Sequence, residues 1–97
     1  MAMTPEGRVK KAIKEHLRQH GVWFTMPIGT GLGSSGVPDF LCCHNGRFVA
    51  IEAKAKGKRG NTSALQKTQI SKIIEAGGVA VVVDDVSQLE GVFQNGT

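Results

Sequence analysis

The feature that most constrains the fold is an Asn-Gly dipeptide, Asn45-Gly46, between two short apolar segments. Asn-Gly is a strong hairpin signal, because both residues tolerate the positive φ angles of a two-residue type I′ turn. We therefore expect residues 38–44 and 47–54 to form two antiparallel strands. This turn also sets the register of the pair, since every residue before it then has a defined partner after it.

The register that follows from this turn places two acidic side chains opposite each other. Counting outward from the turn, Asp39 pairs with Glu52, and directly opposed Cβ atoms lie ~4.5–5.5 Å apart on one face of a sheet. Like charges in this position destabilise a sheet, so a positive charge must compensate. Lys54 shares the face and could form a salt bridge on a solvated surface. A divalent cation bound by both carboxylates is the other interpretation.

The rest of the chain predicts helices and strands on either side of the hairpin. Thr4-Pro5 is typical of a helix start, and Val9, Ile13 and Leu17 follow at helical spacing. We expect a helix at 4–21, a strand at 22–26, a glycine-rich loop at 29–36, a basic loop at 55–60, an amphipathic helix at 63–76, a fully buried strand at 79–83 and a short helix at 86–93. The order α-β-β-β-α-β-α predicts an α/β domain with a mixed sheet flanked by helices.

Length and composition limit the function classes. The 97 residues predict a single domain over 1–97 with a core at about 4–93, and the net charge of +4 suits a polyanionic partner, although many basic proteins bind none. We see no apolar run near the ~20 residues of a membrane helix and no stretch that resembles a signal peptide. The only cysteines, Cys42 and Cys43, are adjacent, which favours a reducing interior over secretion.

Two further polar residues lie on the apolar faces of the expected helices. Glu6 is seven residues before Ile13, within ~20° of it on the helical wheel, although an acid there also complements the helix dipole. Gln66 lies in line with Ile70, but it equally fits a capping box with Ser63. For both residues a site role and a local structural role stay open.

A convergence of these groups would form a metal site beside a lysine. Oxygen ligands with few histidines suit Mg²⁺ or Mn²⁺ rather than zinc. Acids next to a lysine and a basic surface indicate phosphodiester hydrolysis, in which the metal holds the phosphate and activates water. The converging set is Glu6, Asp39, Glu52, Gln66 and Lys54. A separate metal pair, His16 and His20, has helical i,i+4 spacing but no evident third ligand.

The same residues resemble a known nuclease motif. Pro38-Asp39, then Glu52-Ala53-Lys54 after twelve residues, is similar to the PD-(D/E)XK motif. With the helix acid Glu6, the Gly36-Val37 step before the motif and Ser63–Gln66 at the next helix start, nearly the whole chain resembles the virus-type replication-repair nuclease (VRR-NUC) family.

The resemblance implies a restriction-endonuclease-like core and a Mg²⁺- or Mn²⁺-dependent nuclease. It assigns the metal to Asp39 and Glu52, with the backbone carbonyl of Ala53 completing the site and Glu6 supporting it directly or through water. It makes Lys54 the catalytic lysine and lets Gln66 position lysine and water. Ala53 replaces a more usual bulky residue, but its side chain faces away from the acids.

The resemblance also implies partners. Stand-alone members of this size are similar to Holliday-junction resolvases that act on four-way DNA junctions as symmetric homodimers. We expect DNA phosphates to contact a basic loop and the first helix, and Trp23 and Phe24 to be core or dimer surface. The predicted DNA contacts are Lys56, Lys58, Arg59, Lys10 and Lys14.

Other functions remain open at this stage. A non-catalytic nucleic-acid-binding module that keeps the fold is the main alternative, but such a protein has no need of opposed acids. A flap or nicking nuclease of the same superfamily is a second alternative, and a sequence-specific restriction-like enzyme a third. The expected location is the cytoplasm or nucleoid of a bacterial or phage-infected cell, without a membrane partner.

Overall fold

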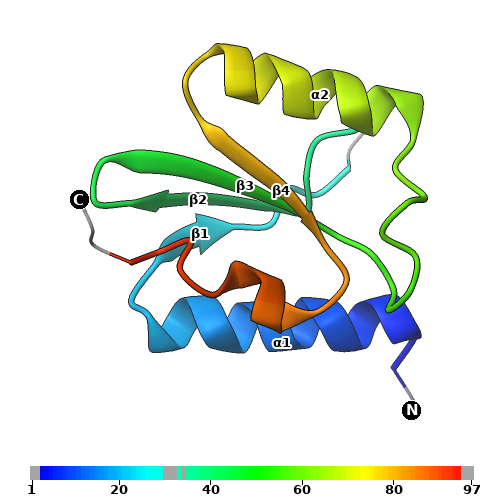
Figure 1. Ribbon diagram of the computed structural model, residues 1–97, viewed down its shortest axis with the longest axis horizontal. Helices are drawn as coiled ribbons and strands as arrows, with labels where there is room; N and C mark the ends of the chain where they lie inside the picture. Colours follow the sequence, from blue (N-terminus) through cyan, green and yellow to red (C-terminus); the bar gives the residue numbers. More distant parts are fainter. Residues whose placement is uncertain (1–2, 30–32, 34, 95–97) are drawn as a thin grey trace.

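Four strands form one mixed sheet in the computed structural model, which describes residues 3–29, 33 and 35–94. Helix α1 lies along one face of the sheet and α2 along the other, so that the chain forms three layers (Figure 1). Within the described residues, neither helix is long and apolar enough to cross a membrane. The elements are α1 (Pro5–Gln19), β1 (Trp23–Thr25), β2 (Phe40–His44), β3 (Arg47–Ala53), α2 (Ala64–Glu75), β4 (Val79–Val83) and the 3₁₀ helix η1 (Val86–Leu89). This architecture confirms the expected mixed sheet flanked by helices.

The hairpin has the predicted turn and register. Asn45 and Gly46 have φ angles of 52° and 78°, as a type I′ turn requires. The five antiparallel pairs run from His44 with Arg47 to Phe40 with Ile51. The sheet order is β1-β2-β3-β4, with the first two pairings antiparallel and β3–β4 parallel.

The core lies between the sheet and α1. The Thr4 hydroxyl caps α1 by accepting a hydrogen bond from the Gly7 amide at 3.0 Å. The apolar stripe of this helix is buried as predicted, and η1 packs beside it (Figure 1). The main buried members of the core are Val9, Ile13, Leu17, Phe40, Cys42, Val49, Ile51, Ala53, Val83, Leu89 and Phe93.

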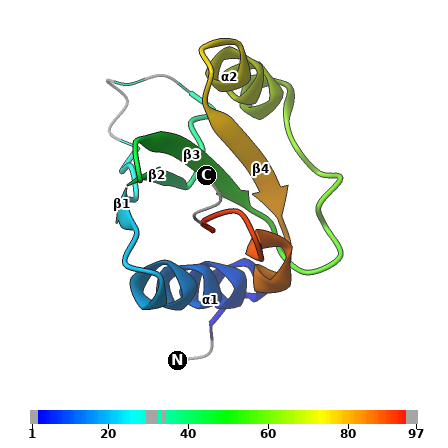
Figure 2. The ribbon, with the colours of Figure 1, turned by 60° about the vertical axis from the view of Figure 1, so that its left-hand side comes forward.

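Strand β4 and helix α2 are less buried than the sequence predicts. We expected a fully buried strand at 79–83, but only Val83 of β4 is buried, because β4 is an edge strand paired on one side alone. Helix α2 contacts β4 and lies beside it, leaving β1 uncovered on this face (Figure 2). No residue of α2 is buried. The continuous apolar run therefore marks an edge strand and not a central one.

Gly36 allows the segment before β2 to pack closely against the start of α2. Gly36 has φ +80°, and a Cβ at this position would lie 2.6 Å from the backbone of Leu65. Only glycine fits both constraints. Of the expected loop at 29–36, residues 30–32 and 34 lie outside the described residues. The helix expected at 86–93 is shorter than predicted: η1 ends at Leu89, and Gly91 takes φ +85°.

Candidate active site

Glu52 lies in the β3 strand, close to its end, and is the buried charged residue of the described part of the chain, with 4% of its surface exposed. Its Oε2 accepts a hydrogen bond from Gln66 Nε2 at 2.9 Å and lies 3.5 Å from Lys54 Nζ. Lys54 Nζ also donates to Gln66 Oε1 at 2.8 Å. These three side chains form a closed network, which we call the Glu-Lys-Gln triangle.

Gln66 makes contacts of both kinds that its spacing allows, a helix cap and a link to the acidic cluster. Its Oε1 accepts from the Ser63 amide at 2.9 Å, while Ser63 Oγ accepts from the Gln66 amide at 3.2 Å. This reciprocal pair is the capping box of α2. The same side chain reaches Glu52 and Lys54, so the start of α2 and the end of β3 are joined at this point.

Asp39 lies directly before β2, beside the end of β3. Its Oδ2 accepts a hydrogen bond from the Ala53 amide at 2.9 Å. The side chain therefore continues the hairpin pairing one step past the last backbone pair, Phe40 with Ile51. Its charge acts on Glu52, where it raises the carboxyl pKa. The two acids that the register placed opposite each other are thus close enough to interact.

Glu6 forms an ion pair with Lys10, a residue that the sequence predicts as a DNA contact. Lys10 Nζ lies 2.9 Å from Glu6 Oε2 and 3.5 Å from Asp39 Oδ1. The i,i+4 spacing of Glu6 and Lys10 signals their pairing, but the contact with Asp39 depends on tertiary packing. No group of three or more His, Cys, Asp or Glu side chains is arranged around a common metal position among the described residues.

The protonation of Glu52 reflects its environment. Burial, and then the charge of Asp39, raise its pKa from 4.5 to about 7, against the opposing effect of Lys54. For Lys10, the hydrogen bond to Glu6 raises the ammonium pKa, and burial partly opposes it. A buried carboxyl group beside a second acid resists ionisation, and a cation at this point would reverse that resistance.

The donor set fits a hard divalent cation. Mg²⁺ usually keeps several waters and binds through one or two carboxylates, without an all-protein cage. Asp39 and Glu52 supply two carboxylates, and the buried Ala53 lies next to Glu52. Asp39 and Glu52 are thus the two carboxylates that could hold such a cation.

Basic residues flank this site on two sides. A groove with a volume of about 500 Å³ runs beside α1, and Lys10 stands between it and Asp39. Its lining is Met3, Gly7, Lys10, Lys11, Lys14, Glu15, Arg18 and Met26. Two of these residues, Lys10 and Lys14, are DNA contacts predicted from the sequence, whereas the groove itself has no sequence signal.

The predicted basic loop is tied to the carboxyl end of β4. Lys56 Nζ lies 3.8 Å from Asp85 Oδ2, and Arg59 Nε donates to the Val82 carbonyl at 2.9 Å. The Lys58 side chain is exposed. The Lys56 side chain is 84% exposed. Its ion pair with Asp85 is therefore weak and leaves the ammonium accessible to an anion.

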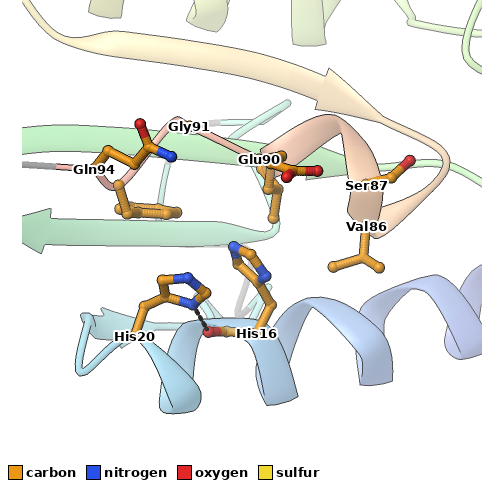
Figure 3. A pocket seen from close by; sticks show the side chains of 9 residues that line it. His16, His20, Val86, Ser87, Glu90, Gly91 and Gln94 are labelled. Atoms are coloured by element: carbon orange, nitrogen blue, oxygen red, sulfur yellow. Dashed lines mark hydrogen bonds between the residues drawn. The ribbon is translucent and has the colours of Figure 1, made fainter.

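His16 and His20 stack against each other near the C-terminal end of α1, away from Glu6 at its start. Their rings are 4.2 Å apart, and His20 Nδ1 contacts the His16 carbonyl at 2.9 Å. They border a cavity of about 290 Å³ together with Glu90 (Figure 3). Over the described residues they belong to no three-ligand metal group.

The fold is similar to that of a solved structure described as a VRR_NUC domain. The TM-score is 0.72 and the sequence identity 26%, over 98% of this chain and 100% of that chain. No protein-family model and no curated protein matches the sequence. The structural match supports a nuclease-type α/β domain. Over nearly its whole length the chain is therefore similar to a VRR-NUC domain, as its sequence motifs predict.

The raised pKa of Glu52 predicts a specific pH dependence of stability. Between the unfolded pKa of 4.5 and the folded pKa of about 7, the folded state binds more protons, so the free energy of unfolding falls as pH rises. In Glu52→Gln, the free energy of unfolding should fall by about 1–3 kcal/mol less than in the wild type over this pH range. Urea unfolding in EDTA from pH 4.5 to 8 measures it.

An exposed acid on α1 provides the matched control. Glu15→Gln should keep the wild-type pH profile, since the Glu15 side chain is exposed. A wild-type protein whose stability rises over this range, with Glu52→Gln removing the rise, would instead mean that Lys54 dominates the ionisation of Glu52.

Proposed function

We propose that the protein is a metal-dependent DNA endonuclease that hydrolyses phosphodiester bonds in branched DNA, with the four-way junction as its substrate. The observation that carries the proposal is the Glu-Lys-Gln triangle beside Asp39 in a nuclease-type fold. A reducing cell interior, that of a bacterium or a phage-infected bacterium, suits the free Cys42 and Cys43.

In this proposal Asp39 and Glu52 hold Mg²⁺ or Mn²⁺, the Ala53 carbonyl completes the site and Glu6 supports it. When bound, the cation supplies Lewis acidity toward the phosphate and a water of lowered pKa. Asp39 is oriented for this role by the Ala53 amide, which holds its Oδ2 at 2.9 Å. Glu52 is buried, and removal of its carboxylate from bulk water strengthens its attraction to a cation.

Lys54 and Gln66 act on the transferring group. The Lys54 ammonium stabilises the charge that develops on the phosphate oxygens in the transition state. Gln66 restricts this ammonium to one position, because its Oε1 accepts from Nζ while its Nε2 is fixed by Glu52. With only 12% of its side chain exposed, Lys54 loses little ordering entropy when substrate arrives.

The basic groove beside α1 supports DNA binding next to the acids. Lys10 and Lys14 line it, and phosphate contacts of this kind position a duplex without reading its sequence. The loop residues Lys56, Lys58 and Arg59 add positive charge where the chain leaves β3. DNA lying between groove and loop would pass the Asp39–Glu52 pair.

A non-catalytic binding module is the competing function. The burial of Glu52 opposes it, because a carboxyl group with a pKa raised to about 7 destabilises the fold at neutral pH. A protein that only binds DNA gains nothing from this arrangement. Sites that lower stability in this way are typical of catalysis.

The nuclease proposal predicts separable effects on cleavage and binding. Asp39→Asn and Glu52→Gln should abolish Mg²⁺-dependent cleavage and keep DNA binding, because each removes a metal ligand and leaves the basic groove intact. Asp39→Asn is preferable to alanine, since its amide oxygen still accepts from the Ala53 amide. The assay uses end-labelled four-way, flap and linear DNA in Mg²⁺, Mn²⁺ or EDTA.

Glu75→Gln changes an exposed acid at the end of α2, outside the basic groove. It is the matched control and should cleave like the wild type. Wild-type turnover by either acid variant would remove the site assignment. Cleavage of flaps in preference to junctions would keep the nuclease and replace the proposed substrate with the flap.

The proposed substrate requires two active sites, and a homodimer supplies them. Each chain has one Asp39–Glu52 pair, whereas symmetric nicking of a junction needs two sites related by a two-fold axis. An apolar sheet patch on the α2 side supports a second copy as partner. Trp23, Cys43 and Phe48 lie side by side there, with Trp23 64% and Phe48 42% exposed. Phe24 packs against Phe40 in the core instead.

The dimer should depend on this patch. Trp23→Ser with Phe48→Ser should shift sedimentation equilibrium from dimer to monomer at micromolar concentration, because large aromatic side chains dominate interface energetics. Leu65→Ser, an exposed apolar position on α2, should leave the dimer intact. A wild-type monomer that stays monomeric on junction DNA would exclude the resolvase function and leave a nicking nuclease.

A further inference from the structure

Lys10 joins two carboxylates that come from different elements of the fold. Its Nζ lies 2.9 Å from Glu6 Oε2 on its own helix and 3.5 Å from Asp39 Oδ1 before β2. The Lys10 side chain is 29% exposed and that of Asp39 is 23% exposed. The ammonium is therefore partly enclosed, with a carboxylate on each side.

The charges around the acids are arranged in two pairs. Lys54 compensates Glu52 inside the Glu-Lys-Gln triangle, and Lys10 compensates Glu6 and Asp39. The interaction of Asp39 and Glu6 with Glu52 is unfavourable for its ionised form. Without Lys10, Glu6 and Asp39 would both lose the ammonium group that lies between them.

A divalent cation bound by Asp39 would compete with the Lys10 ammonium for the Asp39 carboxylate. An ammonium and a metal ion both need carboxylate oxygens, and a dication beside the Lys10 ammonium would repel it. Lys10 also lines the basic groove, so its flexible stem offers the ammonium a second position among phosphates. One residue thus borders both the acid pair and the proposed DNA path.

We propose, resting on the proposed nuclease function, that Lys10 is a built-in counter-ion of the metal-free site. A divalent cation displaces it from Asp39, and the released ammonium binds a DNA phosphate in the groove. Lys10 is thus a positioning residue that couples the arrival of metal to the grip on DNA. The coupling is reciprocal, so DNA bound by Lys10 favours metal at Asp39.

The first test is a calorimetric titration of Mn²⁺ into protein without DNA. Lys10→Met should bind Mn²⁺ about three- to tenfold more tightly than wild type, because the competing ammonium is gone. Lys11→Met removes the same charge from an exposed neighbouring position on α1 and should change the affinity less than twofold. Circular dichroism verifies folding, and Lys10→Gln replaces Lys10→Met if that variant fails to fold.

The second readout is DNA affinity by fluorescence anisotropy in EDTA and in Ca²⁺. The loss caused by Lys10→Met should be several-fold larger in Ca²⁺ than in EDTA, whereas a plain phosphate contact would lose equally in both. Equal Mn²⁺ affinities of Lys10→Met and wild type would overturn the counter-ion role. If Asp39→Asn still abolishes Mn²⁺ binding in that case, the proposed nuclease site stands; no Mn²⁺ binding by any variant overturns both.

Discussion

The side-chain amide of Gln66 is the contact on which the site and its supporting layer both depend. Its oxygen accepts from Ser63 and Lys54, and its nitrogen donates to Glu52. One planar group therefore caps α2 and orders a lysine and a carboxylate at the end of β3. Because no residue of α2 is buried, apolar packing alone holds this helix weakly, and these polar contacts fix where it begins.

The rest of the site follows from this anchor. Gly36 lets the chain pass against Leu65 in the first turn of α2, which brings the following segment to the end of β3. Asp39 is then held by the Ala53 amide. Glu52 remains buried at the cost of a raised pKa. The arrangement sacrifices stability to keep two acids close together, as catalytic sites commonly do.

The hairpin and its acids could be predicted from the sequence because they follow from local rules. The Asn45-Gly46 turn sets the register, and the register puts Asp39 near Glu52. The role of Gln66 could not be decided from spacing, because a capping box and a site contact use the same position. The structure shows that one amide serves both.

Other features depend on tertiary packing and left no local signal. The valine run of β4 predicted a buried strand, yet its position at the sheet edge leaves it half-buried. A run of valines reports hydrophobicity and not the number of neighbouring strands. The contact of Lys10 with Asp39 likewise needs α1 to lie beside the start of β2, which spacing along one helix does not encode.

The central claim is that Gln66 orders the site as well as capping α2. The most direct test compares two variants that each lose one half of the capping box. Ser63→Ala removes half of the cap and leaves the Glu-Lys-Gln triangle, so it should cost about 1 kcal/mol of stability and keep single-turnover cleavage in saturating Mg²⁺. Gln66→Met keeps the bond from its own backbone amide to Ser63 Oγ but removes the other half of the capping box and both Gln66 contacts of the triangle. It should slow the same step by about 10–100-fold. Equal cleavage rates for the two folded variants would contradict the account, because Gln66 would then be a helix cap alone.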